Sequence, residues 1–200
     1  MTTYQEQHHD EQDDAPQRAM GQVPTTGRGS MPFATLDGEP LVVLASFALE
    51  DAGAELVDFN VELTELHDRQ RPLVLHDPLC PLTPIAFLRE AVALAVSEDV
   101  VVVGVQPVTD TIKTTRDGVV GETVDREGLW TLTSPVVLPA SVVAGLDGWP
   151  EAEDFPGLVS TLRERYEVRF LEAPALGRRV EDESALALLE ALAAEHPEQR

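Results

Sequence analysis

The chain has very little cysteine and little positive charge. Cys80 is its only cysteine, so it can form neither an internal disulfide nor a zinc site built from several cysteines. Its 14 lysines and arginines face 36 aspartates and glutamates, and the formal net charge is -22. Because such a surface repels nucleic-acid backbones and anionic membranes, we expect neither as a partner. A bound triphosphate would need a local group of cations or a divalent metal ion.

Long apolar runs are absent as well. No stretch approaches the ~18 residues that span a membrane, and the N-terminus is acidic and polar instead of basic and then apolar. Together with the single cysteine, this predicts a cytoplasmic protein. Residues 1–21 are rich in Gln, Asp, Glu and His and have almost nothing to bury, which predicts a disordered acidic tail. Residues 22–200 are then expected to form one domain.

The first half of this domain has the periodicities of an α/β fold. Apolar residues from Leu41 to Leu49 follow helical spacing as far as Gly53, and Pro84 begins a second amphipathic helix. The short apolar runs 72–75 and 100–105 are typical of buried strands. A helix between two buried strands predicts a parallel βαβ unit, and therefore a Rossmann-like, doubly wound, mostly parallel sheet.

The second half contains a segment with a different residue pattern. From about residue 107 to 130, polar and β-branched residues alternate around Asp117-Gly118, which predicts a projecting β-hairpin arm. An edge strand is expected within 56–66. Further elements are expected in this order along the chain: helices at 139–146 and 157–166, a strand at 167–171, and a closing helix at 182–194.

Two groups of polar residues follow the predicted strands, where ligands of such sheets bind. Three motifs occur in order: His76-Asp77-Pro78-Leu79-Cys80-Pro81, then Pro107-Val108-Thr109-Asp110-Thr111-Ile112-Lys113, then Thr123-Val124-Asp125-Arg126 followed by Leu129-Trp130. Through these motifs the chain resembles the 2-C-methyl-D-erythritol 4-phosphate cytidylyltransferases, nucleotidyltransferases of the non-mevalonate isoprenoid pathway. The resemblance covers most of the chain from Val23.

The resemblance implies transfer of a cytidylyl group from CTP to the phosphate of methylerythritol phosphate, a sugar-alcohol phosphate, with Mg²⁺ assisting. It makes Asp77 a catalytic residue beside the nucleotide and the Mg²⁺ ligand. Gly27, Arg28 and Gly29 would form the turn that binds the nucleotide, since glycines let backbone amides approach phosphates. On the residues alone, Asp77 could equally be an aspartate that caps a loop.

The resemblance also assigns the acceptor phosphate, to Thr111, Lys113, Arg126 and Arg179. Arg126, a second catalytic residue, would bind the phosphate through its bidentate guanidinium. The alternatives are a surface ion pair between Arg126 and a neighbouring carboxylate, and a solvated Lys113. In the family the arm reaches into the active site of a second subunit. The resemblance therefore implies a homodimer, or a heterodimer with a paralogue, formed through the arm.

The nucleotide-handling end departs from the family pattern. Met31 lies where the family has an arginine, Pro32-Phe33 where it has Pro-Lys, and Cys80 where it has the arginine of His-Asp-Ala-Ala-Arg-Pro. The segment between residues 53 and 71 is short and lacks the family's serine-bearing stretch that contacts the cytidine. Because the loss of one preorganised charge-stabilising group costs about 10²- to 10³-fold in rate, these differences predict weak catalysis or none.

Three hypotheses follow. In the first, the chain is a degenerate homologue, impaired or inactive in CTP transfer, that acts by binding or dimerisation. In the second, it is an active cytidylyltransferase with a rearranged loop, in which Arg28 and Mg²⁺ replace the missing cations. In the third, it is a ligand-free interaction module. The first predicts association through the arm without turnover, and the second predicts pyrophosphate release that depends on CTP and Asp77.

Overall fold

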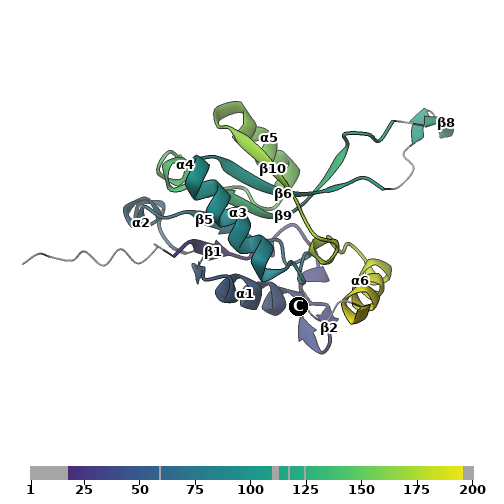
Figure 1. Ribbon diagram of the computed structural model, residues 1–200, viewed down its shortest axis with the longest axis horizontal. Coiled ribbons are helices and arrows are strands. Elements are labelled where there is room, and N and C mark those ends of the chain that lie inside the picture. The colour runs from purple at the N-terminus through teal and green to yellow at the C-terminus, as the bar shows by residue number, and fades with distance from the viewer. Residues whose placement is uncertain (1–17, 59, 110–112, 117, 124, 196–200) are drawn as a thin grey trace, which may run out of the picture.

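The centre of the fold is a six-stranded mixed sheet with helices on both faces (Figure 1). The computed structural model describes residues 18–58, 60–109, 113–116, 118–123 and 125–195. The strand order is β10-β6-β9-β5-β1-β4. The strands are β1 (Met20–Gln22), β4 (Glu55–Leu56), β5 (Leu73–Leu75), β6 (Val101–Pro107), β9 (Trp130–Leu138) and β10 (Val168–Glu172). Among these strands only β9 runs antiparallel to its neighbours, so the predicted Rossmann-like, mostly parallel α/β fold is confirmed.

The first strand lies inside the predicted tail. Met20 and Gly21 pair in parallel register with both β4 and β5, and Met20 is completely buried. The predicted tail boundary at residue 21 is therefore wrong, because a strand this short carries no readable alternation. Residues 1–17 of that tail lie outside the described residues.

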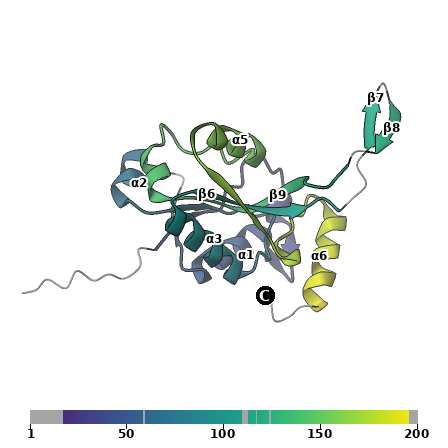
Figure 2. The ribbon, with the colours of Figure 1, turned by 45° about the horizontal axis from the view of Figure 1, so that its top comes forward.

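Helices α1 (Leu41–Asp51) and α3 (Ile85–Glu98) cover one face of the sheet (Figure 2). Leu49 and Leu88 pack there against the strand residues Val74, Val102 and Val137. Both helices were predicted from their apolar spacing, and both form. Pro40 and Pro84 each precede the first helical turn, a place where the missing N–H costs nothing.

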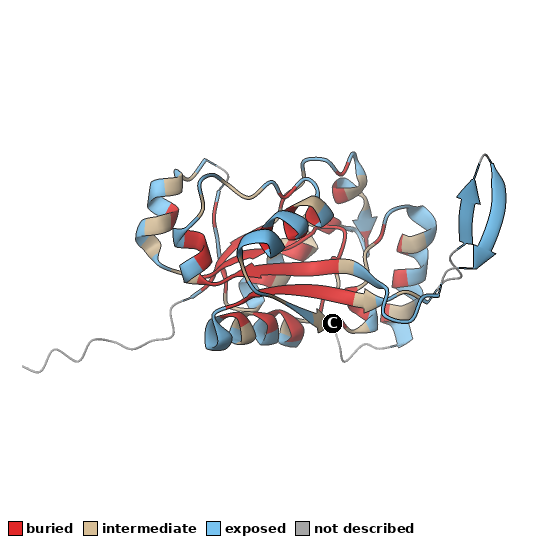
Figure 3. Ribbon diagram, turned by 90° about the horizontal axis from the view of Figure 1, so that it is seen from above, coloured by how far each residue is buried: buried red, intermediate tan, exposed pale blue. Residues whose placement is uncertain are grey.

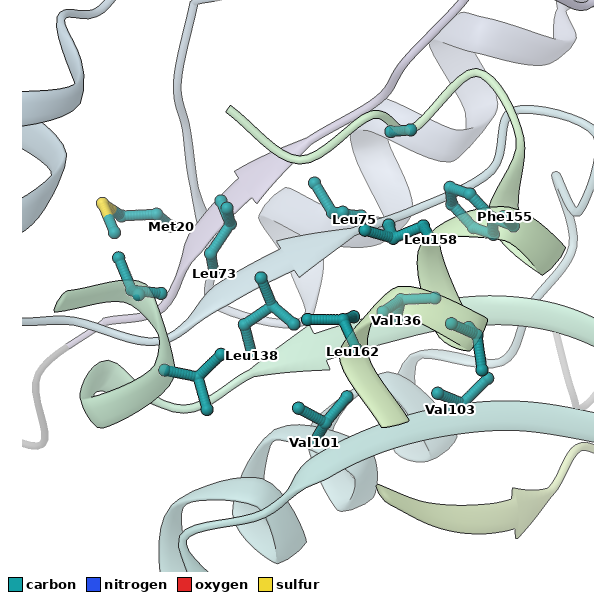
Figure 4. Packing of buried hydrophobic residues seen from close by; sticks show 14 of the residues in the cluster. Met20, Leu73, Leu75, Val101, Val103, Val136, Leu138, Phe155, Leu158 and Leu162 are labelled. Carbon is teal, nitrogen blue, oxygen red and sulfur yellow. The ribbon is translucent and has the colours of Figure 1, made fainter. Parts of the chain in front are cut away.

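Helices α2 (Leu63–Arg69), α4 (Ala140–Ala144) and α5 (Phe155–Arg165) cover the other face. Figure 4 shows Phe155, Leu158 and Leu162 of α5 facing Leu75 and Val136 of the sheet. Strand residues alternate between the two faces, and both faces are covered. That is why β6 is apolar at almost every position, as its sequence predicted.

Two strand predictions need correction. The two buried strands predicted as a βαβ unit, β5 and β6, do run parallel with α3 between them, but β9 is inserted and pairs with both. β9 was not predicted from the sequence, because Pro135 interrupts its apolar pattern. The edge strand expected within 56–66 is confined to Glu55–Leu56, and residues 63–69 form α2 instead. The elements expected at 139–146, 157–166, 167–171 and 182–194 correspond to α4, α5, β10 and α6 (Glu183–Glu195).

A third apolar cluster joins the two ends of the chain. Helix α6 (Glu183–Glu195), η1 (Met31–Phe33), the small hairpin of β2 (Thr35–Leu36) and β3 (Glu39–Pro40), and η2 (Ala175–Gly177) meet there. Leu36, Leu41 and Leu189 are fully buried within it. This cluster brings the turn after β1 close to the segment before α6, and these two segments supply the candidate site.

The predicted arm is present as the hairpin of β7 (Lys113–Arg116) and β8 (Val119–Thr123). It projects from the ends of β6 and β9, and every described residue of its two strands is exposed, as Figures 1 and 3 show. An exposed two-stranded hairpin is only marginally stable by itself. Among the described residues, no helix has both the length and the apolar character to cross a membrane.

Candidate active site

Asp77 lies one residue beyond His76 at the carboxyl end of β5, at the sheet edge where ligands of this fold class bind. Its side chain is almost fully buried and is held by two arginines. Arg28 Nε lies 2.7 Å from Oδ1, and Arg179 Nε lies 3.0 Å from Oδ2. The Leu79 amide donates a further hydrogen bond to Oδ1 at 3.0 Å. Both carboxylate oxygens are thus engaged inside the protein.

Arg28 is fixed as firmly as its partner. It stands in the turn after β1 between two glycines of positive φ, Gly27 at 78° and Gly29 at 58°. Besides Asp77, its guanidinium donates to the Thr26 and Ala152 carbonyls, both at 2.8 Å. It also lies 5.2 Å from the ring centroid of Phe155 and is only 7% exposed. A guanidinium bound in this way has little freedom to turn toward a phosphate.

Arg179 is the more accessible arginine of the pair. Its Nη1 donates to Glu181, and its side chain keeps 29% exposure. Its pKa is raised: burial works against the charged form, but the carboxylate of Asp77 outweighs it. The resemblance assigned Arg179 to the acceptor phosphate. In the fold it lies beside Asp77, and its phosphate role stays a prediction.

The two arginines keep Asp77 ionised. Burial alone would raise the pKa of this carboxyl, but the hydrogen bond and charge of Arg28 reverse that effect. The Leu79 amide and the charge of Arg179 add to it, and the pKa lies below its ordinary value. Together with Glu181, which pairs with Arg179, the cluster holds two guanidiniums and two carboxylates and carries no net charge.

His76 adds a neutral, fully buried imidazole behind Asp77. Desolvation lowers its pKa to about 4, in spite of the opposing charge of Asp77. Its Nδ1 lies 2.5 Å from Ser134 Oγ on β9, and that oxygen accepts the Asp77 backbone N–H at 2.9 Å. The Ser134 hydroxyl has one donor and two acceptor lone pairs, so it can hydrogen-bond Nδ1 in either tautomer of the ring. Within the described part of the chain, Nε2 has no hydrogen-bond partner.

Cys80, on the turn after Asp77, contributes no positive charge. It is fully buried, and desolvation raises the pKa of its thiol well above the ordinary value. A neutral, buried thiol is inert toward substrates. Phe33, at another position where the family carries a cation, is 62% exposed.

The residues around Asp77 do not fit a protein-held Mg²⁺ ion. Mg²⁺ needs oxygen ligands, usually one or two carboxylates together with substrate phosphates. In the described ranges, no three His, Cys, Asp or Glu side chains lie close enough to share a metal ion. Both oxygens of Asp77 face guanidinium groups, which repel a cation. The arrangement therefore favours an ion-paired aspartate over a metal ligand.

The residues predicted to bind the acceptor phosphate are divided between two places. Arg179 is beside Asp77, whereas Lys113 and Arg126 are exposed on and near the arm. Arg126 donates to the Thr109 carbonyl, and within the described residues it forms no ion pair with a neighbouring carboxylate. Thr111 lies outside the described residues. A single chain thus does not unite the predicted catalytic pair of Asp77 and Arg126.

Comparison with known proteins connects this edge of the sheet to a family. Residues 50–147 match the family model of 2-C-methyl-D-erythritol 4-phosphate cytidylyltransferase. A relative of that name from Geotalea uraniireducens is 33% identical over 90 residues, which cover 45% of this chain and 38% of the relative. Another from Clostridioides difficile is 33% identical over 100 residues, covering 50% of this chain and 37% of the relative. The chain is a homologue of these cytidylyltransferases.

The solved structures agree in fold. The 2-C-methyl-D-erythritol 4-phosphate cytidylyltransferase from Thermus thermophilus superposes with a TM-score of 0.64 at 19% identity, over 89% of this chain and 99% of the other. The 4-diphosphocytidyl-2C-methyl-D-erythritol synthase from Anaerococcus prevotii gives 0.60 at 10% identity, over 88% and 99%. In contrast, the sequence matches span less than two fifths of the curated cytidylyltransferases' length. The region of detectable sequence similarity is therefore confined to the middle of the chain.

The matched region contains Asp77 and Arg126, but neither of the two arginines that clamp Asp77. Arg28 and Arg179 both lie outside residues 50–147. No sequence pattern pointed to Ser134, or to the Ala152 carbonyl and the Phe155 ring that hold Arg28 from 124 or more positions away. These contacts join residues that are far apart in the chain, so they become visible only in the tertiary structure.

Proposed function

We propose that this homologue of the cytidylyltransferases acts by binding and by association of chains, with CMP transfer from CTP impaired or lost. One observation supports this above all: Asp77 is closed between Arg28 and Arg179, with both of its oxygens engaged. Triphosphate binding at this edge would need free cations and a carboxylate open to the metal. Here the two arginines and the carboxylate of Asp77 are paired with each other, so neither is free.

The electrostatics of the neighbourhood support the same proposal. The Arg28 guanidinium donates three hydrogen bonds, to Asp77 and to the carbonyls of Thr26 and Ala152. Cys80 is neutral, and the net charge of -22 supplies no general field that attracts a triphosphate. Each missing preorganised cation costs about 10²- to 10³-fold in rate, so their combined absence reduces turnover far below that of a working enzyme.

The binding activity that remains is assigned to the arm. Lys113 and Arg126 give it two exposed cations for the phosphate of a sugar alcohol, and Thr111 stands two positions before Lys113 in the same motif. Val119 and Trp130 are 68% and 42% exposed, and they offer apolar area to a second chain. The proposed assembly is a homodimer or a heterodimer with a paralogue, in the reducing cytoplasm that a lone cysteine suits.

A second candidate is an active cytidylyltransferase, and a specific observation favours it. Arg28 and Arg179 place two guanidiniums on one carboxylate, so a triphosphate that displaced Asp77 would meet both charges. Such an enzyme would need Mg²⁺ with the substrate and a movement of the turn that carries Arg28. This movement would have to break a buried ion pair, which is why we rank it second.

The deciding experiment is a pyrophosphate-release assay with CTP, Mg²⁺ and methylerythritol phosphate. It compares the wild type with Asp77→Asn and Arg126→Ala, and uses Arg116→Ala, another exposed arginine of the arm, as the control. We expect no release above background from folded wild-type protein. Release that Asp77→Asn and Arg126→Ala abolish, but Arg116→Ala leaves intact, would establish the second candidate.

Binding is measured in parallel, by calorimetry with methylerythritol phosphate and by light scattering for the mass of the particle. We expect binding that Arg126→Ala weakens and Arg116→Ala does not, in a particle larger than the 21.8 kDa chain. A monomer that binds no phosphate compound would instead support the ligand-free interaction module.

A further inference from the structure

A cleft of about 910 Å³ lies beside the turn that carries Arg28. Its lining comes from residues 146–154, from α5 and the residue after it, and from Gln22, Pro24 and Thr26 at the end of β1. The Thr26 and Ala152 carbonyls that hold Arg28 belong to lining residues, but Arg28 itself does not line the cleft. A volume in this range is typical of small-molecule sites.

The charge of the lining excludes the family's anionic ligands. Four carboxylates line the cleft, and its one cation, Arg165, is already paired with Asp147 at 3.1 Å. In the described part of the chain, the other three carboxylates, those of Glu151, Glu153 and Asp154, form no ion pair. A triphosphate or sugar phosphate would be repelled here, so the cleft is suited to a ligand of the opposite charge.

Gln22 is the second observation that points to a ligand. Its side chain is 2% exposed and lines the cleft, yet its amide Nε2 has no hydrogen-bond partner in the described residues. An unsatisfied buried amide is costly, and such groups usually have a missing partner. Since Nε2 is a donor, that partner must carry an acceptor oxygen, which an alkylammonium ion by itself lacks.

Two aromatic residues complete the lining. The indole N–H of Trp149 donates to the Val61 carbonyl at 2.8 Å, so only its apolar ring remains for a ligand. Tyr166 lines the same cleft and lies under the Arg165 guanidinium. The carboxylates do not converge on one point, as a metal site requires. They are spread along the cleft, which suits an organic molecule with several donor groups.

We infer that this cleft binds a small hydroxylated organic cation of the amino-sugar class. Its ammonium and hydroxyl groups donate to Glu151 and Glu153, one of its oxygens accepts from Gln22 Nε2, and its C–H face packs on the Trp149 ring. The inference is independent of CTP transfer and of the arm, since none of the residues assigned to those functions lines the cleft.

The test is an NMR titration of the full chain with glucosamine, glucose and cadaverine at equal ionic strength. Glucose matches glucosamine but lacks the charge, and cadaverine has the charge but no oxygen. We expect glucosamine to shift the Gln22 side-chain amide and the Trp149 indole N–H, while the indole of Trp130, at the start of β9, stays unshifted. Glucose and cadaverine should each bind at least about tenfold more weakly.

Matched variants assign the binding to the cleft. Glu151→Gln with Glu153→Gln should weaken glucosamine binding about tenfold, whereas Glu50→Gln with Glu90→Gln removes equal charge from exposed positions of α1 and α3, on the other face of the sheet, and should leave it unchanged. Gln22→Met keeps the side chain's size, removes the amide and should also weaken binding. Equal binding of glucosamine and glucose, equal loss in the two double variants, or no binding at all would overturn the inference.

Discussion

Arg28 Nε lies 2.7 Å from Asp77 Oδ1, and the side chains of both residues are at least 97% buried, which makes this ion pair the most protected in the described structure. The pair ties the turn after β1 to the end of β5, across 49 positions of sequence. An ion pair at such depth is costly to break, because removing one partner leaves the other charged and unsolvated.

The first prediction concerns this pair. Arg28→Met should lower the free energy of unfolding by about 3 kcal/mol or more, since Asp77 would keep only the half-exposed Arg179. Arg116→Met, on the exposed arm, should change it by less than about 0.5 kcal/mol. Urea unfolding monitored by circular dichroism measures both. Equal effects of the two variants would mean that the Arg28–Asp77 pair contributes little to stability.

The second prediction concerns pH and His76. Its pKa in the folded protein, about 4, lies below the ordinary 6.5, so the unfolded chain binds more protons between these values. Stability is therefore greatest above pH 6.5 and falls as the pH drops toward 4, by about 3 kcal/mol in all. His76→Gln should flatten this part of the curve. An unchanged slope in that variant, measured by denaturant titration from pH 7 to 4, would contradict the assignment.

A third prediction compares two glycines of the turn that carries Arg28. Gly27 and Gly29 both have positive φ, but a Cβ on Gly27 would lie 3.1 Å from the Cβ and carbonyl oxygen of Glu153, whereas one on Gly29 would meet nothing within 4 Å. Both alanine variants share the backbone strain of about 1 kcal/mol. Gly27→Ala should therefore be the less stable, by about 1 kcal/mol, in thermal unfolding. Equal melting temperatures would show that the turn moves freely away from Glu153.

The fourth prediction concerns the arm. Val119→Asp places a charge on a residue that is 68% exposed in the single chain, so the fold of one chain should remain intact while association through the arm is lost. Phe47→Asp, on α1 at 53% exposure, is the matched control and should leave association unchanged. Sedimentation equilibrium distinguishes the two. Loss of association in both variants, or in neither, would move the interface away from the arm.

The sequence predicted the elements that have a strong local signal. The helices α1, α3, α5 and α6 follow the spacing of their apolar residues, and β6 is recognisable because both of its faces are buried. β1 and β9 were missed, the first because three residues carry no pattern, the second because Pro135 breaks its apolar run. Such segments become strands because neighbouring strands hydrogen-bond to them, and this pairing depends on how the whole sheet assembles.

By itself, the sequence determined the α/β class, the arm, the position of Asp77 at a strand end and the family likeness, since each rests on residues close together along the chain. Only the tertiary structure decided that Arg28 and Arg179 close on Asp77, that Ser134 holds His76, and that an acidic cleft lies beside Arg28. These partners are separated by 49 to 124 positions in the chain. Their contacts arise from the packing of three apolar clusters around one sheet, which no local pattern encodes.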